Sequence, residues 1–139
     1  MSEGKGIRAI RGATTVDVDD AGQIIEATRE LIAAIVERNG LTSDDVVSAF
    51  FTMTPDLRSE FPARAARELG WDDVPMLCTI EVDVRGALPR CIRTLVHANS
   101  DRPRGEVRHV YLREARVLRP DLADAGRRPA HDGQDADGR

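Results

Sequence analysis

At 139 residues, 41% of them hydrophobic, the chain has the length and composition of one globular domain. Its formal net charge is -4 and no basic stripe is interleaved with aromatics, which argues against nucleic-acid binding. No apolar run approaches the roughly 20 residues that span a bilayer, and the N-terminus lacks an apolar signal segment, so we expect a cytoplasmic protein that binds no membrane.

The first half of the chain predicts a strand, a long helix and a second strand. Residues 7–16 alternate with period two, which predicts a strand. Asp20 is a candidate N-cap for a helix that follows the 3.6-residue apolar period and ends at Asn39 and Gly40. Residues 42–45 form a polar turn that we expect to cap a short helical turn before residues 46–54. That run is apolar and β-branched or aromatic, so we expect a central strand covered on both faces.

The second half predicts two more strands and two more helices. Pro62 in the first turn and Gly70 after the end indicate a short helix over residues 61–69. Residues 75–85 alternate as a strand, and residues 107–112 form the last strand. Between them, we expect Gly86 to turn the chain into a helix. The predicted buried stripe of this helix is Leu88, Cys91, Ile92, Leu95 and Val96.

This order of strands and helices predicts an α/β or α+β fold with one mixed sheet of four or five strands. Two long helices on one face would leave the other face open, and an open face predicts an oligomer. We expect the domain to span residues 1–122. Residues 123–139 lack periodicity and are interpreted as a disordered tail.

No motif for nucleophilic or metal-assisted chemistry is present. The chain has no nucleophile elbow, CxxC pair, HExxH motif or phosphate-binding loop. Cys78 and Cys91 are too few for a metal set, and a cytosolic compartment argues against a disulfide, so we expect two reduced thiols. An enzyme with this sequence would depend on positioning and charge, with no metal and no cofactor.

Arginine is the most informative residue type, because all but one (Lys5) of the 20 basic residues are arginine. A GC-rich coding sequence explains many of them, but not those that interrupt apolar runs. Arg11 is in phase with apolar residues, which is costly without an anionic partner; the alternative is a surface arginine on an edge strand. Arg93 falls beside the apolar stripe of the predicted helix, where a solvated position is slightly favoured unless an oligomer interface covers it. Together with Arg119 they suggest a pocket for a small dianion.

Other polar candidates are open to two interpretations each. Glu81 is as consistent with a solvated carboxylate as with a site residue. Tyr111 fits a buried tyrosine with a bonded hydroxyl, and Cys78 fits a core position. For His109 we favour a structural role over a catalytic one.

Several motifs follow one another in a specific order along the chain. Together they closely resemble the monofunctional bacterial chorismate mutases of the trimeric α/β-barrel type. The resemblance covers residues 7–122, essentially the whole predicted domain. The motifs are IRGATT (10–15), TPDLRSEFPARAAREL (54–69), GW…VP (70–75), CIR (91–93) and RHVYL with VLRPDL (108–122).

The resemblance implies a homotrimer in which three sheets form a pseudo-barrel with the helices outside and the active sites at subunit interfaces. It implies that chorismate is the substrate and prephenate the product, in phenylalanine and tyrosine biosynthesis. This intramolecular Claisen rearrangement breaks an ether C–O bond as a C–C bond forms, without cofactor, nucleophile or base. Catalysis would select the compact substrate conformer and stabilise negative charge on the ether oxygen.

The resemblance also implies roles for particular residues. Arg93 would donate to the ether oxygen and a carboxylate, Arg11 would bind a carboxylate, and Glu81 would accept from the ring hydroxyl; these three form the catalytic set. Tyr111 would hydrogen-bond a carboxylate, and Cys78 would lie beside the hydroxyl. The remaining substrate-binding residues are Phe61, Ala63, Arg64 and Arg67 from the neighbouring subunit, and Leu118 and Arg119 from a closing C-terminal segment.

Departures from the family pattern leave the charged positions intact. Leu77 stands where threonine is familiar, and Arg64 stands where lysine is familiar. A non-catalytic trimeric module that binds another small carboxylate is the main alternative, since fold alone does not decide function. A thiol enzyme or oxidoreductase built on Cys78 is a weaker one.

Overall fold

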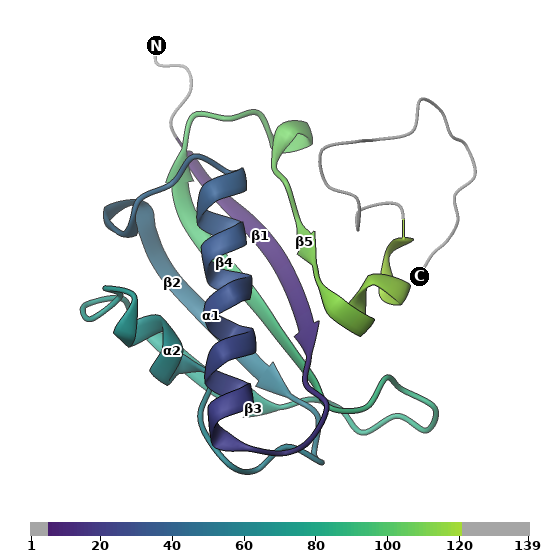
Figure 1. Ribbon diagram of the computed structural model, residues 1–139. Coiled ribbons are helices and arrows are strands. Elements are labelled where there is room, and N and C mark those ends of the chain that lie inside the picture. Colours follow the sequence, from purple (N-terminus) through teal and green to yellow (C-terminus); the bar gives the residue numbers. More distant parts are fainter. Residues whose placement is uncertain (1–5, 121–139) are drawn as a thin grey trace.

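The computed structural model describes residues 6–120 as a five-stranded mixed sheet with strand order β3-β2-β4-β1-β5. Helices α1 and α2 lie against the same face of this sheet (Figure 1). The predicted tail, residues 123–139, lies outside the described residues. The elements are β1 (Gly6–Thr15), α1 (Ala21–Arg38), β2 (Val46–Met53), α2 (Ala63–Glu68), β3 (Met76–Ile80), β4 (Cys91–Ser100) and β5 (Val110–Tyr111), with 3-10 helices η1 (Ser43–Asp45), η2 (Arg104–Glu106) and η3 (Arg113–Leu118).

Helix α1 forms where the sequence predicts it, and its buried stripe packs against the sheet. Asp20 caps it by accepting a hydrogen bond from the backbone N–H of Gln23 at 3.0 Å. The helix ends at Arg38 with Asn39 as its C-cap, and Gly40 follows at φ 64°. Its apolar stripe packs so closely on β1 that a Cβ at Gly12 would lie 2.8 Å from Cδ1 of Ile35. Glycine is therefore needed where the helix crosses the strand.

The strands pair as a mixed sheet, as the sequence predicts. β4 lies between β2 and β1 and runs antiparallel to both. β3 pairs parallel with β2, and the two-residue β5 pairs parallel with β1 at the other edge.

The predicted helix after Gly86 is wrong. The chain turns at Gly86, which has φ 84°, and then forms β4, the central strand. Thr94, Val96 and Ala98 are buried towards α1, while the residues between them face the other side of the sheet. A central strand reads as a nearly continuous apolar run, so its spacing also fits a helical stripe.

Three further predictions differ in extent. β3 ends at Ile80, and the apolar residues after it, which were expected on a buried face, are exposed because the chain leaves the sheet there. Within residues 6–120 α1 is the only long helix, whereas two were expected. β2 is covered on one face alone: Phe50 is 42% exposed within this chain.

The face of the sheet away from α1 is therefore open, as predicted. It presents large apolar side chains, among them Phe50 of β2 and Leu77 of β3, which is 64% exposed. These two residues are register partners on neighbouring strands. In contrast, the main core lies between the opposite face and α1. No helix within residues 6–120 is long and apolar enough to cross a membrane.

Candidate active site

The open face carries a row of side chains that the sequence separates widely. In the register of the sheet, Arg93 lies opposite Thr52 on one side and opposite Ala13 on the other. Ala13 in turn pairs with Tyr111 of β5. Directly opposite residues on neighbouring strands point to the same face, so this row runs from β2 across β4 and β1 to β5.

At one end of the row, a carboxylate meets the guanidinium of Arg93. Nε of Arg93 donates to Oε2 of Glu81 at 3.0 Å, and Oγ1 of Thr52 donates to the same oxygen at 2.8 Å. The Glu81 side chain is 12% exposed and the Arg93 side chain 42%. The backbone N–H of Glu81 donates to the carbonyl of Met53 at 2.9 Å, which fixes the carboxylate beside the end of β2. A shielded carboxylate thus orients a guanidinium that stays accessible to a ligand.

At the other end of the row, a small apolar cluster lies under η3. It comprises Ala13, Cys91, Tyr111 and Ala115, with Leu88 and Leu118 packed against it. The cluster brings the C-terminal segment, including the predicted site residue Leu118, against the same face as Arg93. Tyr111 is 5% exposed here, as expected for a buried tyrosine.

Arg11 lies on this face as well, two residues before Ala13 in β1. Its predicted phase is confirmed, because it shares its face with Ile7 and Ala9. That face is exposed in one chain, so Arg11 is not enclosed among buried apolar residues. β5 pairs with β1, so β1 is not the edge strand that the alternative interpretation assumed.

His109, just before β5, bonds to the backbone of Arg11 and is close enough to Arg119 to feel its charge. Nδ1 of His109 accepts a hydrogen bond from the backbone N–H of Arg11 at 2.9 Å. Burial lowers the pKa of His109, and the positive charges of Arg11 and Arg119 lower it further. Two of the predicted site arginines therefore both act on the charge state of this one imidazole.

The two cysteines are free thiols on opposite faces of the sheet. Burial raises the pKa of Cys91 to about 11, although the charge of Arg93 opposes the rise. Burial also raises the pKa of Cys78, against the backbone N–H of Ala63 and the charge of Arg67. Neither thiol is set up as a nucleophile, since both favour the protonated form. The thiol of Cys78 faces the helix-covered side, away from the Arg93 row.

The predicted residues of the α2 region are not brought to Arg93 within one chain. Phe61 is 63% exposed, and Ala63 is buried against the core. Arg64 pairs with Glu60 at 2.9 Å on the surface of α2. α2 lies on the helix-covered side of the sheet next to α1 (Figure 1). One chain thus supplies part of the predicted site and presents the rest elsewhere on its surface.

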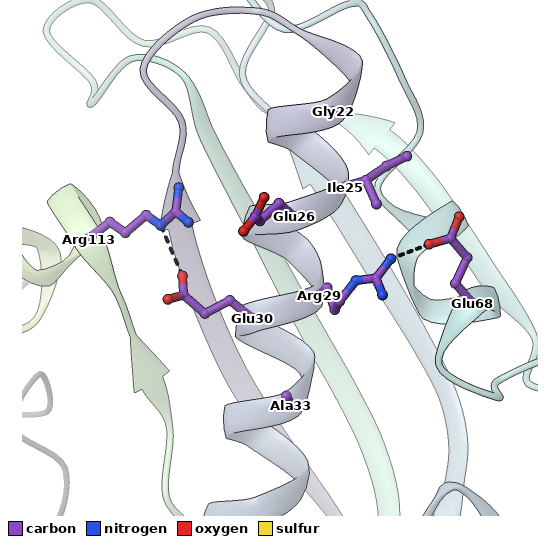
Figure 2. A pocket seen from close by; sticks show the side chains of 8 residues that line it. All are labelled: Gly22, Ile25, Glu26, Arg29, Glu30, Ala33, Glu68 and Arg113. Carbon is purple, nitrogen blue, oxygen red and sulfur yellow. Dashed lines mark hydrogen bonds and ion pairs between the residues drawn. The ribbon is translucent and has the colours of Figure 1, made fainter.

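A separate hollow of about 780 Å³ lies on the outer side of α1 (Figure 2). Arg29 with Glu68 borders it on the α2 side, and Arg113 with Glu30, 2.9 Å apart, borders it on the η3 side. None of the predicted site residues lines it, and its cations are already paired. We therefore place the candidate site on the open face and not in this hollow. No group of three or more potential metal ligands occurs among residues 6–120.

Sequence reasoning missed Thr52 as a partner of Glu81. Its signal is a polar residue in phase with Phe50 on the non-core face of an apolar strand. The role of His109 as an acceptor for Arg11 was also missed, because a hydrogen bond between residues 98 positions apart leaves no local pattern.

The fold and the residue row define a mixed α/β protein with an arginine–carboxylate site on an open sheet face, and comparison assigns its family. The chain belongs to the chorismate mutase type I family, whose model matches residues 7–122. Chorismate mutases are isomerases, and the expected class of enzyme is thereby confirmed.

Two named relatives extend this match over nearly their whole length. The chain is 48% identical over 118 residues to chorismate mutase AroH of Bacillus subtilis, covering 84% of this chain and 93% of the relative. It is 52% identical over 120 residues to chorismate mutase AroH of Thermus thermophilus, covering 86% and 98%. A chorismate mutase structure from Clostridium thermocellum superposes with a TM-score of 0.78 at 46% identity, covering 79% of this chain and 98% of that one.

Proposed function

We propose that the chain converts chorismate to prephenate on the open face of the sheet, with Arg93 and Glu81 at the reacting end of the substrate. The observation that carries this assignment is the bond from Nε of Arg93 to Glu81, which fixes a guanidinium at an accessible surface. The rearrangement is intramolecular, so it needs a shaped and charged surface more than a nucleophile. The raised pKa of both thiols supports the same conclusion.

Arg93 stabilises the transition state through charge. As the ether C–O bond breaks, negative charge develops on the oxygen, and the guanidinium donates to it more strongly than to the neutral ether of the ground state. Glu81 holds Arg93 in position and accepts a hydrogen bond from the ring hydroxyl. Thr52 shares Oε2 of Glu81 and restricts the carboxylate. Cys78 contributes through its backbone, because its thiol faces the other side of the sheet.

The remaining groups bind the substrate's carboxylates and hold its compact conformer. Arg11 and Arg119 offer planar donor pairs suited to carboxylates, and Tyr111 adds a hydroxyl. Leu118 belongs to the segment that packs over this end of the row. Closure of this segment would exclude water and strengthen each charged contact.

A second copy completes the site in the proposed homotrimer. Phe61, Ala63, Arg64 and Arg67 lie on the helix-covered side of their own chain, where Arg93 does not reach. The exposed apolar side chains of the open face, Phe50 and Leu77, support a partner chain at that surface. We also place the protein in the cytoplasm, where its two free thiols would stay reduced.

The activity is tested by the loss of chorismate absorbance on adding the purified protein, with prephenate identified as the product. Arg93→Ala is measured beside the wild type, and Arg85→Ala is a matched control at an exposed arginine. Rapid loss that only Arg93→Ala abolishes supports the assignment. A folded protein that binds chorismate without turnover would instead be the carboxylate-binding module.

Sharing of the site between copies has a separate test. Arg93→Ala and Arg67→Ala are each expected to be nearly inactive, and the two variants are unfolded, mixed and refolded together. If one copy supplies Arg93 and its neighbour Arg67, random trimers contain about one intact site in four. Recovery of about a quarter of wild-type activity supports the shared site, and no recovery from well-folded mixed trimers contradicts it.

A further inference from the structure

We propose that His109 is a positioning residue: its imidazole accepts the backbone N–H of Arg11 and thereby holds Arg11, β5 and Tyr111 in the arrangement that binds substrate. This inference rests on the function proposed above, in which Arg11 and Tyr111 bind substrate carboxylates. His109 itself contacts no substrate in this proposal. It acts indirectly, by holding β5 against β1.

β5 is attached to the sheet by few hydrogen bonds, so the bond between His109 and Arg11 is an important part of that attachment. The β1–β5 ladder consists of two register pairs, Gly12 with Val110 and Ala13 with Tyr111. The backbone N–H of Leu112 donates to the carbonyl of Ala13 at 2.9 Å at one end. At the other end, Nδ1 of His109 accepts from the N–H of Arg11 at 2.9 Å. The imidazole therefore extends the pairing by one position, on the side nearer Arg11.

The bond requires a neutral imidazole with its proton on Nε2, because only an unprotonated Nδ1 accepts. The surroundings favour that form. His109 is half-buried, and the charged groups acting on it are Arg11 from β1 and Arg119 from the segment after η3. Both are positive, so a positive charge on His109 is disfavoured. A neutral acceptor also lets the two arginines share one small region without adding to their repulsion.

Loss of the acceptor would act on substrate binding more than on the chemical step. An unpaired N–H at Arg11 weakens the edge pairing and lets β5 move, and Tyr111 moves with it. Groups that bind carboxylates do so in both the ground state and the transition state, so their displacement raises KM. Arg93 and Glu81 belong to the other end of the row, so kcat is expected to change little.

Three substitutions separate the acceptor from the rest of the side chain. In His109→Asn, the amide oxygen takes a position close to that of Nδ1 and keeps the acceptor. His109→Gln keeps polarity but carries its amide further out, and His109→Ala removes the acceptor. At pH 7.5 we expect KM of the Asn variant within about threefold of wild type. We expect KM of the Gln and Ala variants to rise about tenfold, the effect of one lost hydrogen bond, with kcat within about threefold.

Amide hydrogen exchange gives a readout that does not depend on activity. The Arg11 amide is expected to stay protected in wild type and His109→Asn, and to lose protection in His109→Gln and His109→Ala. Equal KM in all variants, or an Asn variant as impaired as Ala, overturns the proposal. If the wild type itself fails to convert chorismate, the proposed function fails, and exchange at Arg11 alone then decides whether His109 fastens the strand. Circular dichroism of each variant shows whether it is folded.

Discussion

Glu81 and Arg93 meet at 3.0 Å although Glu81 follows the end of β3 and Arg93 lies in β4, beyond the loop that joins the two strands. The turn at Gly86 and the two antiparallel strands that flank β4 bring them together. The hydrogen bond to Glu81 orients the guanidinium of Arg93 through Nε, and the Arg93 side chain stays partly exposed. That arrangement decides what a substitution at Arg93 should do.

Replacing Arg93 is expected to remove most of the catalytic rate. Arg93→Ala should lower kcat about a hundred- to a thousandfold, because one preorganised donor to a developing oxyanion is worth about 3–4 kcal/mol. Arg93→Lys should also be poor, since an ammonium cannot donate to Glu81 and the ether oxygen through a planar fork. Steady-state kinetics with Arg85→Lys as the control measure both effects. A lysine variant with near-normal kcat would show that a point charge is sufficient.

The start of β4, two residues before Arg93, is held by a carboxylate whose removal should cost stability. Both oxygens of Asp56 accept from the backbone N–H of Arg90, at 3.2 and 3.0 Å, and Oδ1 accepts from Oγ1 of Thr54 at 2.6 Å. Arg90 has φ 49°, a backbone conformation that residues other than glycine adopt only at a cost in free energy. Asp56→Ala should therefore lower the free energy of unfolding by about 1–2 kcal/mol.

Urea denaturation measures this loss, with Asp73→Ala as a control at an exposed aspartate. Asp56→Asn should recover part of the stability, because the amide oxygen still accepts from one N–H. Equal midpoints for Asp56→Ala and the wild type would mean that the turn before β4 is held by other contacts.

Thiol reactivity should follow burial. Cys91 has 0% exposure and a pKa raised to about 11, so its thiolate is scarce at pH 8. We expect iodoacetamide to label Cys78, which is half-buried, before Cys91, and both slowly relative to the urea-unfolded chain. Mass spectrometry of time points resolves the two sites, and Cys78→Ser identifies the remaining one. Faster labelling of Cys91 in the folded protein would contradict the buried position.

The long helix could be predicted from the sequence, and the central strand could not. α1 has an N-cap at Asp20, a stripe of period 3.6 and a glycine at its end, and these signals agree. In β4, Cys91 and Ile92 are both buried although they are adjacent, because the small cluster under η3 covers one face and α1 the other. Burial on both faces removes the alternation that distinguishes a strand from a helix.

For the candidate site as well, the sequence predicts some features and not others. The apolar surroundings in the sequence singled out Arg11 and Arg93, and the resemblance to a family supplied the roles of Arg93, Glu81 and Tyr111. Strand alternation placed Arg11 in phase with apolar residues, but Arg93 was expected on a helix. Their contacts depend on strand register and on the path of the loop after β3, which no local pattern encodes. Thr52 was missed for this reason: it becomes a partner of Glu81 only when β3 pairs in parallel with β2.

His109 should titrate below its ordinary pKa of 6.5, because burial and two nearby arginines disfavour the imidazolium. Arg11→Ala removes one positive charge but keeps the backbone N–H, so it should raise the pKa of His109 towards 6.5. The lowered pKa also makes stability depend on pH. Between the folded pKa and 6.5 the unfolded chain binds more protons, so the free energy of unfolding falls as the pH drops below 6.5. NMR titration of the imidazole in the wild type and in Arg11→Ala measures the change in the pKa of His109, with Arg104→Ala as a control at an exposed arginine. An unchanged pKa in Arg11→Ala would mean that burial and Arg119 keep His109 neutral without a contribution from Arg11.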